Sequence, residues 1–235
     1  MTSLSPANAE RLKLAFQQCR DMEGTLNERL RAYAVAGREI FPAYSEAVDR
    51  LVERINESGS GENVPRPGDQ MPPFILPDET GRLINLESLL KNGAVAVMFH
   101  RGHWCPYCRL NVRSVVQAKD QIKALGGQII AITPETQEFA AKFKAEANAP
   151  FPVLTDLDNG YALSLNLAIW LGAEIQQLLS YLDLSSFHGN DGWVLPIPAT
   201  FVVGRDGRIK ARFVDTDFRR RMEIEDLIAE FKDAA

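Results

Sequence analysis

The sequence contains few cysteines and no long apolar run. Its 235 residues include 3 cysteines, too few for the disulfide-stapled scaffold of a small secreted protein. No apolar stretch approaches the roughly 18–20 residues that a membrane-spanning helix needs. The segment from Met1 to Pro6 lacks the charged and apolar regions of a secretory signal. We therefore expect a cytoplasmic protein with no membrane partner.

Positive charge is not in excess either. With 26 basic against 31 acidic residues, the formal net charge is −5, which argues against nucleic acid or an anionic membrane as a general partner. The hydrophobic share of 46% and the charged share of 24% are ordinary for a globular protein. The length suits one full domain with an extension.

The extension is an N-terminal arm, residues 1–57, whose pattern predicts a helical hairpin. Ser5 followed by Pro6 is typical of a helix start, and Gly37 and Pro42 indicate the break between two helices. Apolar residues recur at helical steps on both sides, at Leu12, Phe16, Cys19, Leu26, Leu30 and Tyr33, then at Phe41, Tyr44, Val48, Leu51, Val52 and Ile55. We expect the arm to pack on the main domain or to form a homodimer. Cys19 lies on the first stripe, so we expect it to be a small buried hydrophobe.

Residues 58–63 have the composition of a flexible linker, and the main domain comprises residues 64–235. Strands are expected at 74–76, 83–86, 94–99, 128–132, 152–154, 198–203 and 209–214, the last two as a hairpin. Helices are expected at 88–92, 110–125, from 134–136 onward, at 159–166, within 168–187 and at 223–232. This alternation predicts an α/β fold with a mixed sheet, and the unbroken apolar run 94–99 predicts a strand buried on both faces.

Two thiols, Cys105 and Cys108, stand where that strand gives way to a helix. A thiol at a helix start feels the unpaired N–H groups and the positive end of the dipole. We therefore expect a lowered pKa at Cys105, which precedes Pro106, and a raised pKa at Cys108, one turn inside. The spacing predicts a disulfide between these two rather than with Cys19. The pair suits thiol–disulfide exchange or peroxide reduction, and its position favours Cys105 as the first nucleophile.

A strand, then Trp-Cys-x-x-Cys, a helix and a later Ile-Pro before a strand resemble the thioredoxin fold. More closely, residues 64–235 resemble the peroxiredoxin-like branch of the AhpC/TSA family. The matching motifs are Phe74 and Asp78, then residues 99–108, 132–135, 151–156 and 196–203. The resemblance implies a thioredoxin-like mixed sheet flanked by helices, and an antioxidant thiol-dependent oxidoreductase without a cofactor. Its substrate would be a small peroxide or a protein disulfide, and its electron donor a thioredoxin-like protein or another dithiol.

The sequence departs from that family at two places. Cys105 stands where typical peroxiredoxins carry a threonine, and Cys108 stands at their peroxide-attacking cysteine. Pro198 replaces the arginine expected before Thr200, which leaves Arg101 or Arg109 to supply charge. The resemblance to thioredoxin also implies a cis Ile197–Pro198 bond beside the sulfurs. The residues expected to bind substrate or support the thiols are Trp104, Pro106, Tyr107, Arg101, Ile197, Pro198 and Thr200.

Two other interpretations remain open from the sequence. The cysteine pair has zinc-like spacing, with His100, His103 and His188 as the remaining candidate ligands, but a second close ligand pair is missing. Alternatively, the dithiol belongs to a redox-responsive binding module or sensor in which the arm engages a partner. The run from Arg219 to Arg221 is expected to be a solvated face. All redox motifs lie beyond the linker, so the arm is expected to be dispensable for the chemistry.

Overall fold

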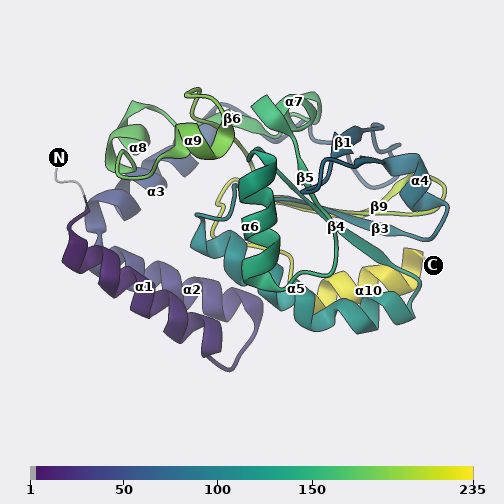
Figure 1. The fold of residues 1–235 in the computed structure, drawn as a ribbon, viewed down its shortest axis with the longest axis horizontal. Coiled ribbons are helices and arrows are strands. Elements are labelled where there is room, and N and C mark those ends of the chain that lie inside the picture. The colour runs from purple at the N-terminus through teal and green to yellow at the C-terminus, as the bar shows by residue number, and fades with distance from the viewer. Residues whose placement is uncertain (1–3, 235) are drawn as a thin grey trace.

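The computed structural model describes residues 4–234 and has a five-stranded mixed sheet at its centre (Figure 1). The strand order is β5-β4-β3-β8-β9, with bounds Val153–Thr155, Gln128–Thr133, Val95–Phe99, Ala199–Val203 and Ile209–Val214. The pairs β3–β4 and β4–β5 are parallel, whereas β3–β8 and β8–β9 are antiparallel. The predicted mixed α/β sheet and its closing hairpin are confirmed.

Strand β3 is central because its sequence has no polar face. All of its residues are buried, as the unbroken apolar run predicts for a strand covered on both sides. It leads into α5 (Pro106–Ala124), which packs against α6 (Gln137–Ala147), α10 (Ile224–Ala234) and a helix of the arm. The start of α5 therefore lies at the carboxyl end of the central strand, where Cys105 is.

Smaller elements surround this sheet. They are β1 (Ile75–Pro77), β2 (Leu83–Asn85), α4 (Leu86–Leu90), a 3₁₀ turn (Leu157–Asn159), α7 (Gly160–Ser164), β6 (Ala168–Trp170), α8 (Ala173–Leu178), α9 (Leu184–His188) and β7 (Val194–Pro196). The helical pattern expected over 168–187 is wrong for its first part, because residues 168–170 pair as a strand with β7. Gly172, with φ at +89°, separates this strand from α8.

The arm contains three helices instead of the predicted two: α1 (Pro6–Asp21), α2 (Leu26–Ile40) and α3 (Pro42–Glu57). The first break falls at Gly24, with φ at +139°, a conformation that favours glycine. Thr25 then starts α2 with a capping box. The Thr25 hydroxyl accepts from the backbone N–H of Glu28, and the Glu28 carboxylate accepts from the backbone N–H of Thr25. Gly37 lies inside α2 and does not end it.

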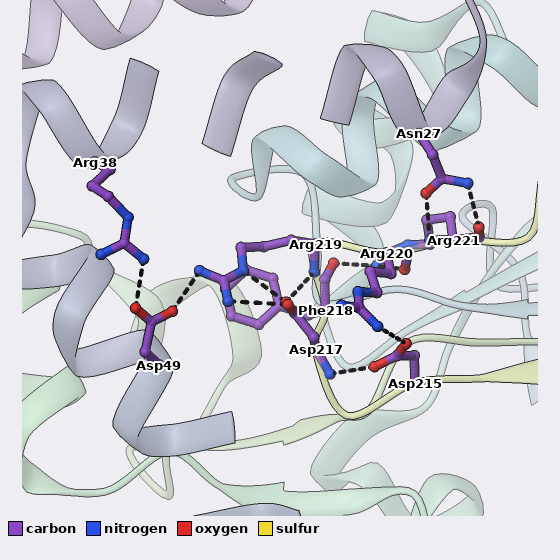
Figure 2. A network of polar contacts seen from close by, with 9 residues as sticks. All are labelled: Asn27, Arg38, Asp49, Asp215, Asp217, Phe218, Arg219, Arg220 and Arg221. Carbon is purple, nitrogen blue, oxygen red and sulfur yellow. Dashed lines mark hydrogen bonds and ion pairs between the residues drawn. The ribbon is translucent and has the colours of Figure 1, made fainter. Parts of the chain in front are cut away.

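The arm packs on the main domain in part through residues 216–223, some of which Figure 2 shows. Asn27 donates from Nδ2 to the carbonyl of Arg221 at 2.8 Å and accepts from the N–H of Arg221 at 3.2 Å. Arg219 donates to Asp49 of α3 at 2.9 Å. Glu223 accepts from the N–H of Asn27 at 2.9 Å, at the start of α2, where a carboxylate is stabilising.

The two-domain division, the flexibility of residues 58–63 and the homodimer stay predictions. Cys19 is 6% exposed on the apolar side of α1, as expected for a small buried hydrophobe. Within residues 4–234, no helix combines the length and the apolar character that crossing a bilayer requires.

Candidate active site

Cys105 and Cys108 lie at the first turn of α5, as the sequence predicts. Cys105 is the N-cap residue: its carbonyl accepts from the N–H of Arg109 at 3.1 Å, and Pro106 occupies the first helical position. Its own N–H donates to the carbonyl of Gly102 at 3.2 Å, which closes the turn after β3. Both thiols are free and buried, with exposed fractions of 1% for Cys105 and 0% for Cys108.

Two donors point at the sulfur of Cys108. The N–H of Arg101 lies 3.4 Å from Sγ, and Nη2 of Arg221 lies 3.6 Å from it. Burial alone would raise the pKa of Cys108, but the adjoining Cys105 thiol, the His100 ring and the charge of Arg221 hold that pKa well below its ordinary value. The arrangement stabilises a thiolate at Cys108.

The pKa of Cys105 moves the other way. Burial, followed by the adjoining Cys108 sulfur, raises it well above its ordinary value, against the opposing charges of Arg101 and Arg221. The predicted order of the two pKa values is therefore wrong. The helix start lies where the sequence places it, but both thiols are buried, and the adjoining Cys108 sulfur adds to the rise in the pKa of Cys105. A guanidinium from residue 221 reaches Cys108 instead, because the chain folds back beside α5.

The Arg101 side chain enters the same site from the loop after β3. It is only 2% exposed, and its Cζ lies 3.8 Å from the ring centroid of Phe218 and 4.9 Å from that of Trp104. Among the residues that the structure describes, none of its three side-chain nitrogens has a hydrogen-bond acceptor. Arg109 is less suited to supply positive charge to the thiols, since it pairs with Glu146 at 3.3 Å and lies over Phe16.

The three histidines have different partners. His103 Nδ1 lies 2.6 Å from Oε1 of Glu135, and the backbone N–H of His103 donates to the other carboxylate oxygen at 2.9 Å. The His100 ring packs edge-on against Phe143. Burial lowers the pKa of His188 to about 4. In the described part of the chain, no group of three or more His, Cys, Asp or Glu residues is placed to hold a metal ion.

A cavity of about 410 Å³ opens beside Cys105. Trp104, Pro106 and Tyr107 line it, as does Arg101. Much of the remaining wall comes from all three helices of the arm. The arm therefore forms one side of the space next to the thiols, and whether it is dispensable for the chemistry stays a prediction.

Ile197, Pro198 and Thr200 are buried but do not line this cavity. Every peptide bond among the described residues is trans, so the cis Ile197–Pro198 bond implied by the resemblance is not found. The chain reaches β8 directly from β7, which pairs with β6, and the N–H of Ile197 donates to the carbonyl of Leu167 at 2.7 Å. These contacts hold the segment extended. A supporting role for the three residues stays a prediction.

Arg221 is the residue of this site that sequence reasoning missed. The expected solvated face holds only for Arg220, whose side chain is 69% exposed, whereas Arg221 is 3% exposed and reaches Cys108. Arg219 lies between these extremes, paired with Asp217 at 2.7 Å. The only signal was the run of arginines itself, and nothing in it distinguishes the inward residue from its neighbours.

Comparison with known proteins agrees with this geometry. The sequence profile of the AhpC/TSA family matches residues 67–212, which is more than half of the chain. The chain belongs to the AhpC/TSA family. A putative peroxiredoxin of Mycobacterium tuberculosis (strain CDC 1551) is 27% identical over 143 residues, covering 61% of this chain and 81% of that protein. Chloroplastic Peroxiredoxin Q of Sedum lineare is 28% identical over 92 residues, covering 39% of this chain and 49% of that protein. This AhpC/TSA chain thus spans about half the length of that relative.

Solved structures of related fold match about 70% of this AhpC/TSA chain. Peroxidoxin BcpB from Mycobacterium tuberculosis has a TM-score of 0.57 at 19% identity, with 73% of this chain and 99% of that chain covered. Peroxiredoxin 6 of Arenicola marina has a TM-score of 0.55 at 17% identity, with 70% of this chain and 71% of that chain covered. At these identities the likeness shows the fold, and it confirms the thioredoxin-like, peroxiredoxin-like architecture.

Proposed function

We propose that this protein is a thiol-dependent peroxide reductase in which Cys108 attacks and Cys105 resolves. The observation that carries the proposal is the convergence of the Arg101 N–H and the Arg221 guanidinium on the sulfur of Cys108. A thiolate is the reactive form of cysteine, and Cys108 is the thiol whose pKa is lowered. It also stands at the attacking position of the family pattern. Cys105 is therefore no longer our choice for the first nucleophile.

The proposed cycle has three steps. The Cys108 thiolate attacks one peroxide oxygen; the O–O bond breaks, the cysteine becomes a sulfenic acid, and the leaving alkoxide or hydroxide takes a proton. The Cys105 sulfur then attacks the sulfenic sulfur, forming the intramolecular disulfide and releasing water. An external dithiol reduces the disulfide and returns both thiols. No cofactor is required, and a thioredoxin-like protein is the proposed electron donor in a reducing, cytoplasmic setting.

Arg101 is the proposed partner of the peroxide. Its guanidinium lines the cavity, and its nitrogens have no acceptor among residues 4–234. A guanidinium can donate to the peroxide oxygen on which negative charge develops, which lowers the barrier to O–O cleavage. This places a cation in the site although Pro198 occupies the family's usual arginine position.

One observation favours thiol–disulfide exchange as a second function. Cys105, and not Cys108, lines the cavity, so a bulky disulfide meets Cys105 first. In that reaction Cys105, once deprotonated by the neighbouring thiolate, attacks the substrate disulfide and expels one substrate thiolate, which takes up a proton. Cys108 then attacks the resulting mixed disulfide, forms the Cys105–Cys108 disulfide and releases the second substrate thiol.

Steady-state turnover with dithiothreitol as the donor separates these functions. We expect the protein to consume hydrogen peroxide or tert-butyl hydroperoxide catalytically, and expect Cys108→Ser to abolish this consumption. Cys105→Ser should still form the Cys108 sulfenic acid but not the intramolecular disulfide. Cys19→Ser is the matched control and should retain the wild-type rate. If the protein reduces insulin disulfides but neither peroxide, the second function replaces the first. If it does neither, the redox-responsive binding module becomes the better account.

A further inference from the structure

The cavity beside Cys105 is walled largely by aromatic side chains. Four of them, Phe16, Tyr33, Phe41 and Tyr44, come from the arm, and four more come from the main domain: Trp104, Tyr107, Tyr181 and Phe218. Its volume of about 410 Å³ lies within the range of roughly 300–1,000 Å³ typical of small-molecule sites. An apolar enclosure of this size is much larger than a hydrogen peroxide molecule needs.

The charges around this cavity are of one sign. Five lining residues are basic, Lys13, Arg20, Arg101, Arg109 and Arg219, and none of the lining residues is acidic, although the whole chain carries a net charge of −5. Four of the five have a carboxylate partner nearby. The pairs are Lys13–Glu10, Arg20–Asp21, Arg109–Glu146 and Arg219–Asp49. Within residues 4–234, Arg101 has none.

Arg101 is also the most enclosed of these cations. It is 2% exposed, and Nε, Nη1 and Nη2 all lack an acceptor in the described part of the chain. The rings of Phe218 and Trp104 attract the cation, and the neighbouring Tyr44 hydroxyl helps to raise the pKa of Arg101, but none of these groups is a carboxylate. A guanidinium stays protonated in proteins, and burying its donors without acceptors is costly.

The thiolate does not remove this imbalance. Arg101 and Arg221 are two buried cations, and the lowered pKa of Cys108 supplies a single negative charge. Arg221 already donates to that sulfur and to the carbonyls of Phe218 and Arg220. One positive charge, at the cavity wall, therefore remains without an anion.

We propose that this cavity binds an organic monocarboxylate, with its head group on Arg101 and its apolar body against the aromatic walls. A planar carboxylate accepts two parallel N–H bonds from a guanidinium, and one negative charge matches the one unbalanced cation. The apolar walls favour a molecule with a hydrocarbon or aromatic body over a small inorganic anion. Such a ligand would lie against Cys105 and cover it. The inference is independent of the redox step, because binding needs no peroxide.

Calorimetric titration of the reduced protein with octanoate, 1-octanol and acetate tests the proposal. We expect octanoate to bind at least tenfold more tightly than 1-octanol, and acetate to bind weakly for want of a body. Arg101→Met should bring octanoate and 1-octanol to similar affinity. Arg31→Met is the control: Arg31 is an exposed arginine of α2, so the variant makes the same change of charge and should keep the tenfold preference.

Filling the cavity gives a second, independent variant. Gly37 lines the cavity inside α2, and a Cβ there would have no heavy atom within 4 Å. Gly37→Leu should therefore fold at least as stably as the wild type, since leucine favours a helix over glycine, and should lose both octanoate and 1-octanol. Octanoate should also slow alkylation of Cys105 in the wild type and not in this variant.

Three results would overturn the proposal. They are equal binding of octanoate and 1-octanol by the wild type, an octanoate preference that survives Arg101→Met, and unchanged binding in Gly37→Leu. If circular dichroism shows that Arg101→Met does not fold, the wild-type comparison and Gly37→Leu decide the matter. Because no peroxide is present, a protein without peroxidase activity can still bind octanoate, so failure of the proposed function is distinguishable from failure of this inference.

Discussion

Replacing Arg221 by methionine tests whether the C-terminal segment controls the thiolate. Nη2 of Arg221 lies 3.6 Å from Sγ of Cys108, and both residues are buried. A hydrogen bond from a charged donor is worth about 1.5–3 kcal/mol, and one pKa unit corresponds to about 1.4 kcal/mol. Methionine keeps an apolar side chain of similar reach without the charge. We therefore expect the pKa of Cys108 to rise by about 1–2 units.

The assay is the pH dependence of alkylation by iodoacetamide, resolved by peptide mass spectrometry in a Cys19→Ser background. Arg220→Met is the matched control, because the Arg220 side chain is 69% exposed. Arg221 also donates to the carbonyls of Phe218 and Arg220, so circular dichroism must show that the variant is folded. If the pKa of Cys108 moves no further in Arg221→Met than in Arg220→Met, the electrostatic account of the thiolate is refuted.

Three further predictions concern stability and pairing. Gly102→Ala should destabilise the fold by at least about 1–3 kcal/mol in urea unfolding, because φ is +136° and a Cβ would lie 2.5 Å from Oε1 of Glu135; an unchanged midpoint would contradict this. Burial lowers the pKa of His188 from 6.5 to about 4, so the buried ring is neutral in the folded protein. The free energy of unfolding is therefore undiminished above pH 6.5, the pKa in the unfolded chain, and falls as the pH drops toward 4. At pH 5 this loss should reach about 2 kcal/mol, and His188→Gln should show a correspondingly smaller fall between pH 7 and pH 5; identical pH profiles would be evidence against it. Peptide mapping of the oxidised protein should find Cys105 bridged to Cys108, and a bridge from Cys19 to either would be inconsistent with its place on the arm.

The sequence was sufficient for features that depend on local pattern. The apolar run before the dithiol predicts the buried central strand, and Pro106 predicts the helix start, because each is determined by neighbouring residues. The predicted hairpin missed the break between α1 and α2, although a local signal marks it. Gly24 followed by Thr25, with Glu28 three residues later, is a helix-start signal, and the apolar stripe that continues through it concealed it.

The order of the two thiol pKa values depends on contacts that no local pattern contains. Arg221 is 113 residues from Cys108 in the sequence, and Asn27, which binds the backbone of Arg221, lies 194 residues before Arg221. Helix position alone favoured Cys105, but the contact between the two sulfurs raises the pKa of Cys105 and lowers that of Cys108, which the His100 ring and the Arg221 guanidinium lower further. The role of the arm was hidden for the same reason, since its stripes predict burial without saying against which surface.

The most direct test of the central claim is to trap the sulfenic acid. Cys105→Ser, in a Cys19→Ser background, is treated with one equivalent of hydrogen peroxide and then with dimedone, and the modified peptide is identified by mass spectrometry. We predict rapid, stoichiometric dimedone labelling of Cys108, and no comparable labelling of Cys105 in the matching Cys108→Ser protein. Rapid labelling of Cys105 in Cys108→Ser, together with an inert Cys108, would contradict the account.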